Sequence, residues 1–180
     1  MQLIPAPFDE TAFVERWLPI VLRWCGCLGG ARVDPEDACH DILLRALDRL
    51  PTLRDQEKLG SWMFGITRRV LAAHRRSSWI RRWVPGLTVE AVDSAPSPYR
   101  LRQRQETTEA VQAVLDTMPD DLREVLVLCD VDERTDEEAA AMLGLSVGTA
   151  KSRLRRARER FEATARKRGL HVALHVLEGA

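Results

Sequence analysis

The sequence predicts an all-α protein of two small helical domains joined by a flexible linker. Apolar residues recur every three to four positions along most of the chain, which is the spacing of helices with one buried face. No run alternates convincingly as a strand would, and glycines and prolines cut the chain into helix-length stretches. A length of 180 residues with 45% hydrophobic and 30% charged residues is enough for one ordinary domain or two small cores.

A first helix is predicted over about Glu10 to Leu28, ending at the glycines that follow. Pro19 should bend or interrupt it, because proline removes a backbone donor. Charged residues scattered through the first 30 positions interrupt the apolar run that a signal peptide needs, and no later run is long enough to cross a membrane. We therefore expect a cytoplasmic protein whose four cysteines are reduced thiols.

The second helix has a well-marked start. Asp34 is a good N-cap, Pro35 suits the first helical position, and the acidic residues that follow favour the positive end of the helix dipole. Pro51 should end the helix. Its predicted buried face consists of Ala38, Ile42, Leu43, Ala46, Leu47 and Leu50.

A polar loop from Thr52 to Gly60 leads into a third predicted helix, about Ser61 to Arg76, with Trp62, Ile66 and Val70 on one side. Residues 77–106 are rich in proline, serine and arginine and are predicted to form the linker. Helical periodicity resumes at about residue 107, with breaks at Met118-Pro119 and near Asp132. This divides the chain into domains at 8–76 and 107–167 and a tail at 168–180.

The net charge of zero hides a strong local asymmetry. Residues 107–145 hold 11 acidic against two basic side chains, whereas residues 146–180 hold nine basic against three acidic ones. A basic segment of this kind is typical of a surface that binds a polyanion.

The clearest local motif is a helix–turn–helix over residues 135–161. Thr135 and Glu138 form a capping-box pattern, Gly144 permits a tight turn, and Ser146 can cap the next helix. In this arrangement the early turns of the second helix enter the major groove of DNA. Its predicted core-facing stripe is Val147, Ala150, Leu154, Ala157 and Phe161.

The remaining faces of that helix are basic. Arginine and lysine donate to guanine edges and phosphates, and serine and threonine bond either. The alternative is a helical hairpin whose arginines only keep it soluble. The residues expected to face DNA are Lys151, Ser152, Arg155 and Arg156, with Thr149 near the backbone.

Residues 124–161 resemble the fourth conserved region of extracytoplasmic-function (ECF) sigma factors of bacterial RNA polymerase. That motif runs approximately E-x-A-x-x-L-G-[IL]-S-x-G-T-V-[KR]-S-R-L-x-R-A-R. Ala150 stands in place of its usual valine, and Glu133 and Arg134 replace a common glycine–leucine pair.

Two further segments resemble the family's second region: residues 34–47, DPEDACHDILLRAL, and residues 60–76, GSWMFGITRRVLAAHRR. Gly65 and Arg69 depart from the arginine and asparagine that are frequent there. The resemblance covers about residues 10–76 and 107–165. It implies a sigma factor that directs promoter-specific transcription initiation and is not an enzyme, with core polymerase, promoter DNA and an anti-sigma factor as partners.

The resemblance also implies roles for three sets of residues. The polar side of the second helix would dock on the clamp helices of the polymerase; the alternative is an ordinary solvated face. The residues on that side are Asp37, Asp41, Arg45, Asp48 and Arg49. The third helix and the loop before it would capture the downstream, minus-ten-type element. The candidate residues are Arg54, Lys58, Trp62, Arg68, Arg69, Arg75 and Arg76. For Trp62 the alternative is a core residue. The helix–turn–helix would recognise the upstream, minus-thirty-five-type element.

Other functions are less well supported by the sequence. A helix–turn–helix regulator that acts without joining polymerase is the main alternative. A nuclease using Asp34, Asp37 and Asp41 is weak, because capping and a polar face already explain these carboxylates. Cys25, Cys27 and Cys39 match no common zinc spacing, so neither a metal site nor a cofactor is expected.

Overall fold

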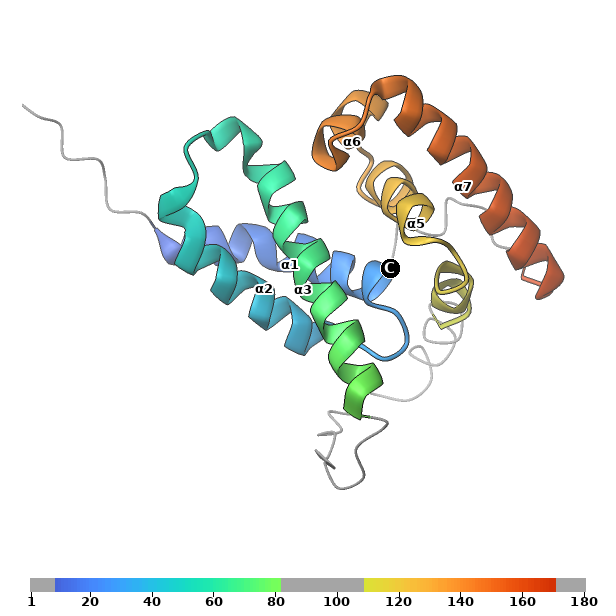
Figure 1. Ribbon diagram of the computed structural model, residues 1–180, viewed down its shortest axis with the longest axis horizontal. Coiled ribbons are helices and arrows are strands. Elements are labelled where there is room, and N and C mark those ends of the chain that lie inside the picture. The colour runs from blue at the N-terminus through green and yellow to red at the C-terminus, as the bar shows by residue number, and fades with distance from the viewer. Residues whose placement is uncertain (1–8, 82–108, 171–180) are drawn as a thin grey trace, which may run out of the picture.

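The computed structural model describes residues 9–81 and 109–170, and within these ranges it contains helices and turns but no strand, as predicted. Figure 1 shows two groups of helices lying side by side, the first coloured blue to green and the second yellow to red. The first group consists of α1 (Glu10–Gly29), α2 (Pro35–Arg49), the short 3₁₀ turns η1 (Leu50–Thr52) and η2 (Gln56–Lys58), and α3 (Leu59–Arg81). The second consists of a short helix over residues 109–115, α5 (Asp120–Leu126), the π-helical turn η3 (Val127–Val131), α6 (Asp136–Leu143) and α7 (Val147–Lys167).

Helix α1 runs through Pro19 without interruption, so of the two predicted effects of this proline, a bend or an interruption, the interruption is wrong. Pro19 lies on the exposed side, where water can bond the carbonyl that proline leaves without a partner. The opposite side is held in the core by Trp17, Val21 and Trp24. Packing of that side therefore outweighs the lost backbone hydrogen bond.

Helix α2 begins as predicted. The Asp34 carboxylate accepts hydrogen bonds from the backbone N–H groups of Glu36 and Asp37, at 2.9 and 3.0 Å. The α-helix ends at Arg49, and the chain tightens into η1, which contains Pro51.

Helix α3 continues past the predicted end at Arg76 to Arg81, so the first residues assigned to the linker are helical. The Ser77 hydroxyl donates to the backbone oxygen of His74 at 3.0 Å, a bond compatible with continued helix. No glycine or proline occurs between Gly65 and Pro85 to stop the helix earlier. The rest of the predicted linker, residues 82–106, lies outside the described residues, as do residues 171–180 of the tail.

The predicted breaks at Met118-Pro119 and near Asp132 are confirmed by turns between the helices of the second group. Glu133, which stands where the resembling family has glycine, has a φ of 52°. This left-handed conformation favours glycine and is strained for glutamate.

The helix–turn–helix is also confirmed. The Thr135 hydroxyl accepts from the N–H of Glu138 at 3.1 Å, and the Glu138 carboxylate accepts from the N–H of Thr135 at 2.9 Å. Gly144 follows with a φ of 68°, and the Ser146 hydroxyl accepts from the N–H of Thr149 at 3.2 Å. Of the predicted stripe on α7, Val147 is half-buried and the others are buried: Ala150, Leu154, Ala157 and Phe161.

One continuous hydrophobic core extends through both groups of helices. In the first group it is centred on Trp24 and Phe64, and in the second on Leu126 and Phe161, all fully buried. Helix α3 contacts α6, and α1 contacts α5 and η3, so the two predicted domains pack directly against each other. None of the helices in the described ranges is both long and apolar enough to span a membrane.

The strain at Glu133 predicts that Glu133→Gly raises the free energy of unfolding by up to about 1 kcal/mol, because glycine adopts a positive φ without steric cost. The matched control is Glu162→Gly, an exposed position inside α7, which should lower it by about 1 kcal/mol. Urea unfolding of the two variants measures both values. Equal destabilisation by both substitutions would show that Glu133 is not strained.

Candidate nucleic-acid interface

Helix α7 presents an exposed basic face in its early turns. The four residues predicted to face DNA are all exposed. Lys151 lies one turn before Arg155, and Ser152 lies one turn before Arg156. The Lys151 ammonium lies 3.8 and 4.0 Å from carboxylates of α6, and the Arg155 guanidinium lies 2.6 Å from Glu159. Such exposed ion pairs are weak in water, so these cations remain available to a polyanion.

Three hydroxyls at the start of this face are held by local hydrogen bonds. The hydroxyls of Thr149 and Ser146 are 2.8 Å apart, and the Ser152 hydroxyl donates to the backbone oxygen of Thr149 at 2.9 Å. Thr149 is half-buried. The start of α7 therefore fixes the positions of these three hydroxyls relative to the helix.

Other arginines of α7 attach the helix to its own domain. The Arg158 guanidinium forms a bidentate pair with Asp130, at 3.0 and 2.5 Å, and these hydrogen bonds raise the pKa of Arg158. Arg153 lies 3.6 Å from Asp121, and Arg160 donates to the backbone oxygen of Thr117 at 3.2 Å. The sequence analysis left these three arginines out of the DNA-facing set but did not predict that they hold α7 to its own domain.

The predicted polymerase-binding residues share the exposed side of α2. Asp41 is engaged by His74 of α3 at 2.8 Å. Leu44 lies among these residues with 52% of its surface exposed, and sequence analysis did not select it. The helical spacing could have identified Leu44 as an exposed apolar residue, because it lies outside the predicted buried face of this helix. The other four predicted residues are exposed: Asp37, Arg45, Asp48 and Arg49.

The predicted downstream-element residues are in several different environments. Arg54 and Lys58 are exposed, and Lys58 pairs with Asp55 at 3.1 Å, which lowers the pKa of that carboxyl. Arg69 is exposed and donates to the backbone oxygen of Gly65 at 2.9 Å. Trp62 is half-buried and packs against the core, which agrees with the alternative interpretation of it as a core residue.

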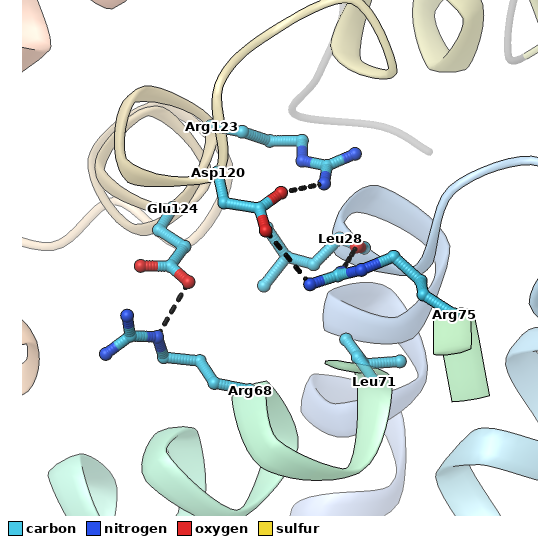
Figure 2. A pocket seen from close by; sticks show the side chains of 7 residues that line it. All are labelled: Leu28, Arg68, Leu71, Arg75, Asp120, Arg123 and Glu124. Atoms are coloured by element: carbon cyan, nitrogen blue, oxygen red, sulfur yellow. Dashed lines mark hydrogen bonds and ion pairs between the residues drawn. The ribbon is translucent and has the colours of Figure 1, made fainter. Parts of the chain in front are cut away.

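Arg68 and Arg75 instead contact the second group of helices (Figure 2). The Arg68 Nε atom lies 2.6 Å from Glu124, and an Arg75 nitrogen lies 3.0 Å from Asp120. Burial raises the pKa of Glu124, and the charge of Arg68 opposes that shift. Figure 2 shows these side chains around a small cavity of about 10 Å³, room for about one water molecule.

The four cysteines are free thiols. Burial is the main cause that raises the pKa of Cys25 to about 12 and those of Cys27 and Cys129 to about 11. Asp132 adds to the shift at Cys27. In the part of the chain that the structure describes, no three His, Cys, Asp or Glu side chains cluster so that they could hold a metal ion.

Comparison with known proteins matches both halves of the chain. Residues 13–84 match the family model for sigma-70 region 2, and residues 108–161 match that for sigma-70 region 4. The ECF RNA polymerase sigma factor EcfG of Rhodopseudomonas palustris is 33% identical over 150 residues, covering 81% of this chain and 79% of that protein. The ECF sigma factor SigE of Mycolicibacterium smegmatis is 29% identical over 143 residues, covering 78% of this chain but 55% of the relative.

The fold matches a solved structure as well. The sigma factor RpoE of Bartonella quintana, crystallised with the anti-sigma factor NepR, aligns with a TM-score of 0.62 and 25% identity, covering 88% of this chain and 97% of that one. With both sigma-70 regions present in order and a relative above 30% identity over most of both chains, this chain belongs to the ECF sigma factors of the sigma-70 family, which direct promoter-specific transcription initiation by RNA polymerase.

Proposed function

We propose that three surfaces of this sigma factor divide the work of initiation. The basic face of α7 recognises the upstream promoter element, the loop before α3 together with α3 recognises the downstream element, and the exposed side of α2 binds the polymerase clamp. The observation that carries this proposal is the exposed basic face of α7, which the capped helix–turn–helix presents in a fixed orientation.

In this proposal the protein acts by binding and not by catalysis. Contacts with polymerase and duplex DNA offset the cost of extruding promoter bases, a few kcal/mol for each base. Two weak DNA contacts held on one polymerase act at high effective concentration. The isolated chain is therefore expected to bind promoter DNA weakly and with strong salt dependence.

The domain assignment belongs to the same proposal: region 2 over residues 8–76, a linker over 77–106, region 4 over 107–167 and a tail of unassigned role over 168–180. The site of action is the cytoplasm, where polymerase and DNA are found. An anti-sigma factor is proposed as a further partner, supported by the complex in which the Bartonella quintana relative was solved.

Run-off transcription tests the proposed function. Core bacterial polymerase is supplied with a promoter library, with and without this protein, and a second sigma factor serves as the positive control. Products that start at defined sites only when the protein is present are expected. Their absence alongside an active control would favour a regulator that binds DNA without joining polymerase.

The α7 surface predicts that Arg156→Ala weakens promoter binding by the holoenzyme about tenfold, because a good base or phosphate contact from arginine is lost. Arg166→Ala is the matched control, since Arg166 is also exposed on α7 but lies in its last turn. Dissociation of labelled promoter DNA from the holoenzyme measures both. An equal effect of the two substitutions would indicate only general loss of positive charge.

The α2 surface predicts that Leu44→Ser weakens binding to core polymerase about tenfold, because burying a leucine side chain contributes about 1.5 kcal/mol or more. Stability should hardly change, since Leu44 is 52% exposed. Leu18→Ser, at a leucine of α1 that is 44% exposed, is the control and should leave binding near the native value. Fluorescence anisotropy of labelled protein titrated with core polymerase measures both affinities.

A further inference from the structure

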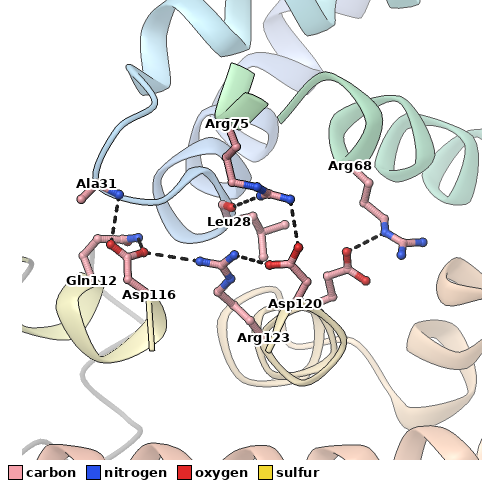
Figure 3. A network of polar contacts seen from close by, with 9 residues as sticks. Leu28, Ala31, Arg68, Arg75, Gln112, Asp116, Asp120 and Arg123 are labelled. Carbon is pink, nitrogen blue, oxygen red and sulfur yellow. Dashed lines mark hydrogen bonds and ion pairs between the residues drawn. The ribbon is translucent and has the colours of Figure 1, made fainter. Parts of the chain in front are cut away.

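Two arginines of α3 are engaged by the second group of helices (Figure 3). Arg68 lies 2.6 Å from Glu124, and Arg75 lies 3.0 Å from Asp120. Asp120 also pairs at 2.5 Å with Arg123, whose side chain is 6% exposed. These two arginines of α3 therefore have carboxylate partners within the protein, although Arg68 stays 46% exposed.

The arginines that directly follow them in the sequence are placed differently. Arg69 and Arg76 are exposed, and among the described residues neither pairs with a carboxylate. They lie within about 20° of each other around α3, because seven residues make almost two full turns of a helix. The same side of α3 carries Gly65, Ala72 and Ala73, which are half-buried. Together these five residues form a strip with two cations and no bulky side chain between them.

Arg69 is held in one orientation by the backbone of its own helix. Its Nε–H donates to the backbone oxygen of Gly65, one turn earlier, at 2.9 Å. A Cβ atom added at position 65 would lie 3.5 Å from Nη2 of Arg69, so the guanidinium lies against the glycine. The N–H groups of the two Nη atoms remain available to a ligand, because only Nε is used by the helix. Gly65 thus fixes a guanidinium fork without occupying its outer donors.

A fixed guanidinium fork suits a flat pair of acceptors. Arginine donates two parallel hydrogen bonds to O6 and N7 of guanine, which is the commonest specific contact between a side chain and a base. Holding the fork in place before binding reduces the conformational entropy lost when this contact forms. Contacts to phosphate carry no sequence information and need no such anchor. Among the described residues Arg76 has no anchor of this kind, so the two cations of the strip are suited to different parts of DNA.

We propose that Arg69 is a specificity-determining residue that selects guanine at one position of the downstream promoter element. Gly65 positions its guanidinium, and Arg76 binds the DNA backbone two turns further along α3. This inference rests on the proposed function, in which α3 recognises the downstream element. The resembling family frequently has asparagine where this chain has Arg69. Because an amide pairs with N6 and N7 of adenine, this exchange changes the base that the position prefers.

The test is run-off transcription by the holoenzyme on promoters whose downstream element is randomised and whose transcribed region carries a barcode. Sequencing of the products gives the base preference at every position of the element. With the native protein we expect guanine to be preferred about tenfold over other bases at one position. Arg69→Asn should lose this preference and favour adenine at the same position. Circular dichroism checks that the variant keeps its helices, as expected for a substitution at an exposed residue.

Arg76→Asn is the matched control, since it makes the same exchange on the same strip. It should lower the yield from all promoters by a similar factor and leave the base preferences unchanged, because a lost phosphate contact affects every sequence alike. The inference is overturned if Arg69→Asn behaves in this uniform way, or if both substitutions abolish the guanine preference.

Two substitutions at Gly65 test whether it positions Arg69. Gly65→Ala should keep the guanine preference, because its Cβ atom makes only an ordinary van der Waals contact with the guanidinium. Gly65→Val adds two carbons around that Cβ, in the space where the guanidinium lies, and should reduce the preference at least about threefold although Arg69 is still present. An unchanged preference in Gly65→Val would show that the glycine does not position the arginine.

The native protein separates failure of this inference from failure of the proposed function. Polymerase-dependent products without any guanine preference in the downstream element would overturn the inference and leave the proposed function standing. No products from any promoter, alongside an active second sigma factor, would overturn both.

Discussion

The indole of Trp24 joins the parts of this molecule. Its ring is fully buried and meets Phe64 of α3 edge-on, with the ring centroids 5.0 Å apart. It is also tilted against the ring of Trp17, with the centroids 6.2 Å apart. Its N–H donates to Asp132, beyond η3 in the second group of helices. One side chain therefore fixes α3 on α1 and also satisfies the buried carboxylate that connects the domains. Without Trp24, the core would lose the ring contact with Phe64, and Asp132 would lose a hydrogen-bond donor.

Features fixed by neighbouring residues were predictable from the sequence. The caps at Asp34, Thr135 and Ser146 depend on bonds across two or three positions, so their residue patterns identify them directly. The faces of α2 and α7 follow from helical spacing for the same reason. Misjudged features, such as the unbroken α1 at Pro19, depend on tertiary packing that local propensity does not contain.

The packing of the two domains was beyond prediction because its partners are far apart in sequence. Arg23 and Asp132 are separated by 109 positions, and Arg68 and Glu124 by 56. A count of charges showed an acidic segment beside a basic one, and the basic segment was interpreted as a polyanion surface. The structure shows that part of the acidic segment binds arginines of the first domain. The three candidate surfaces thus differ in their partners. Arg68 of α3 pairs with Glu124 of the second group while staying 46% exposed, whereas among the described residues the candidates on α2 do not pair with the second group and those on α7 pair only within α6 and α7.

The position of the Cys27 thiol makes its reactivity sensitive to the contact between the two groups of helices. Its pKa of about 11 reflects burial and the nearby charges of Asp132, Arg23 and Arg123, which all belong to the polar contacts around the domain boundary. Because the thiolate is the form that reacts with alkylating reagents, burial at this boundary keeps the sulfur largely protonated and slow to react near neutral pH. Separation of the domains would hydrate the thiol and move its pKa back towards the ordinary value. The native sequence thus carries its own chemical probe of domain separation, the alkylation rate of Cys27, which needs no introduced cysteine and which mass spectrometry can follow peptide by peptide.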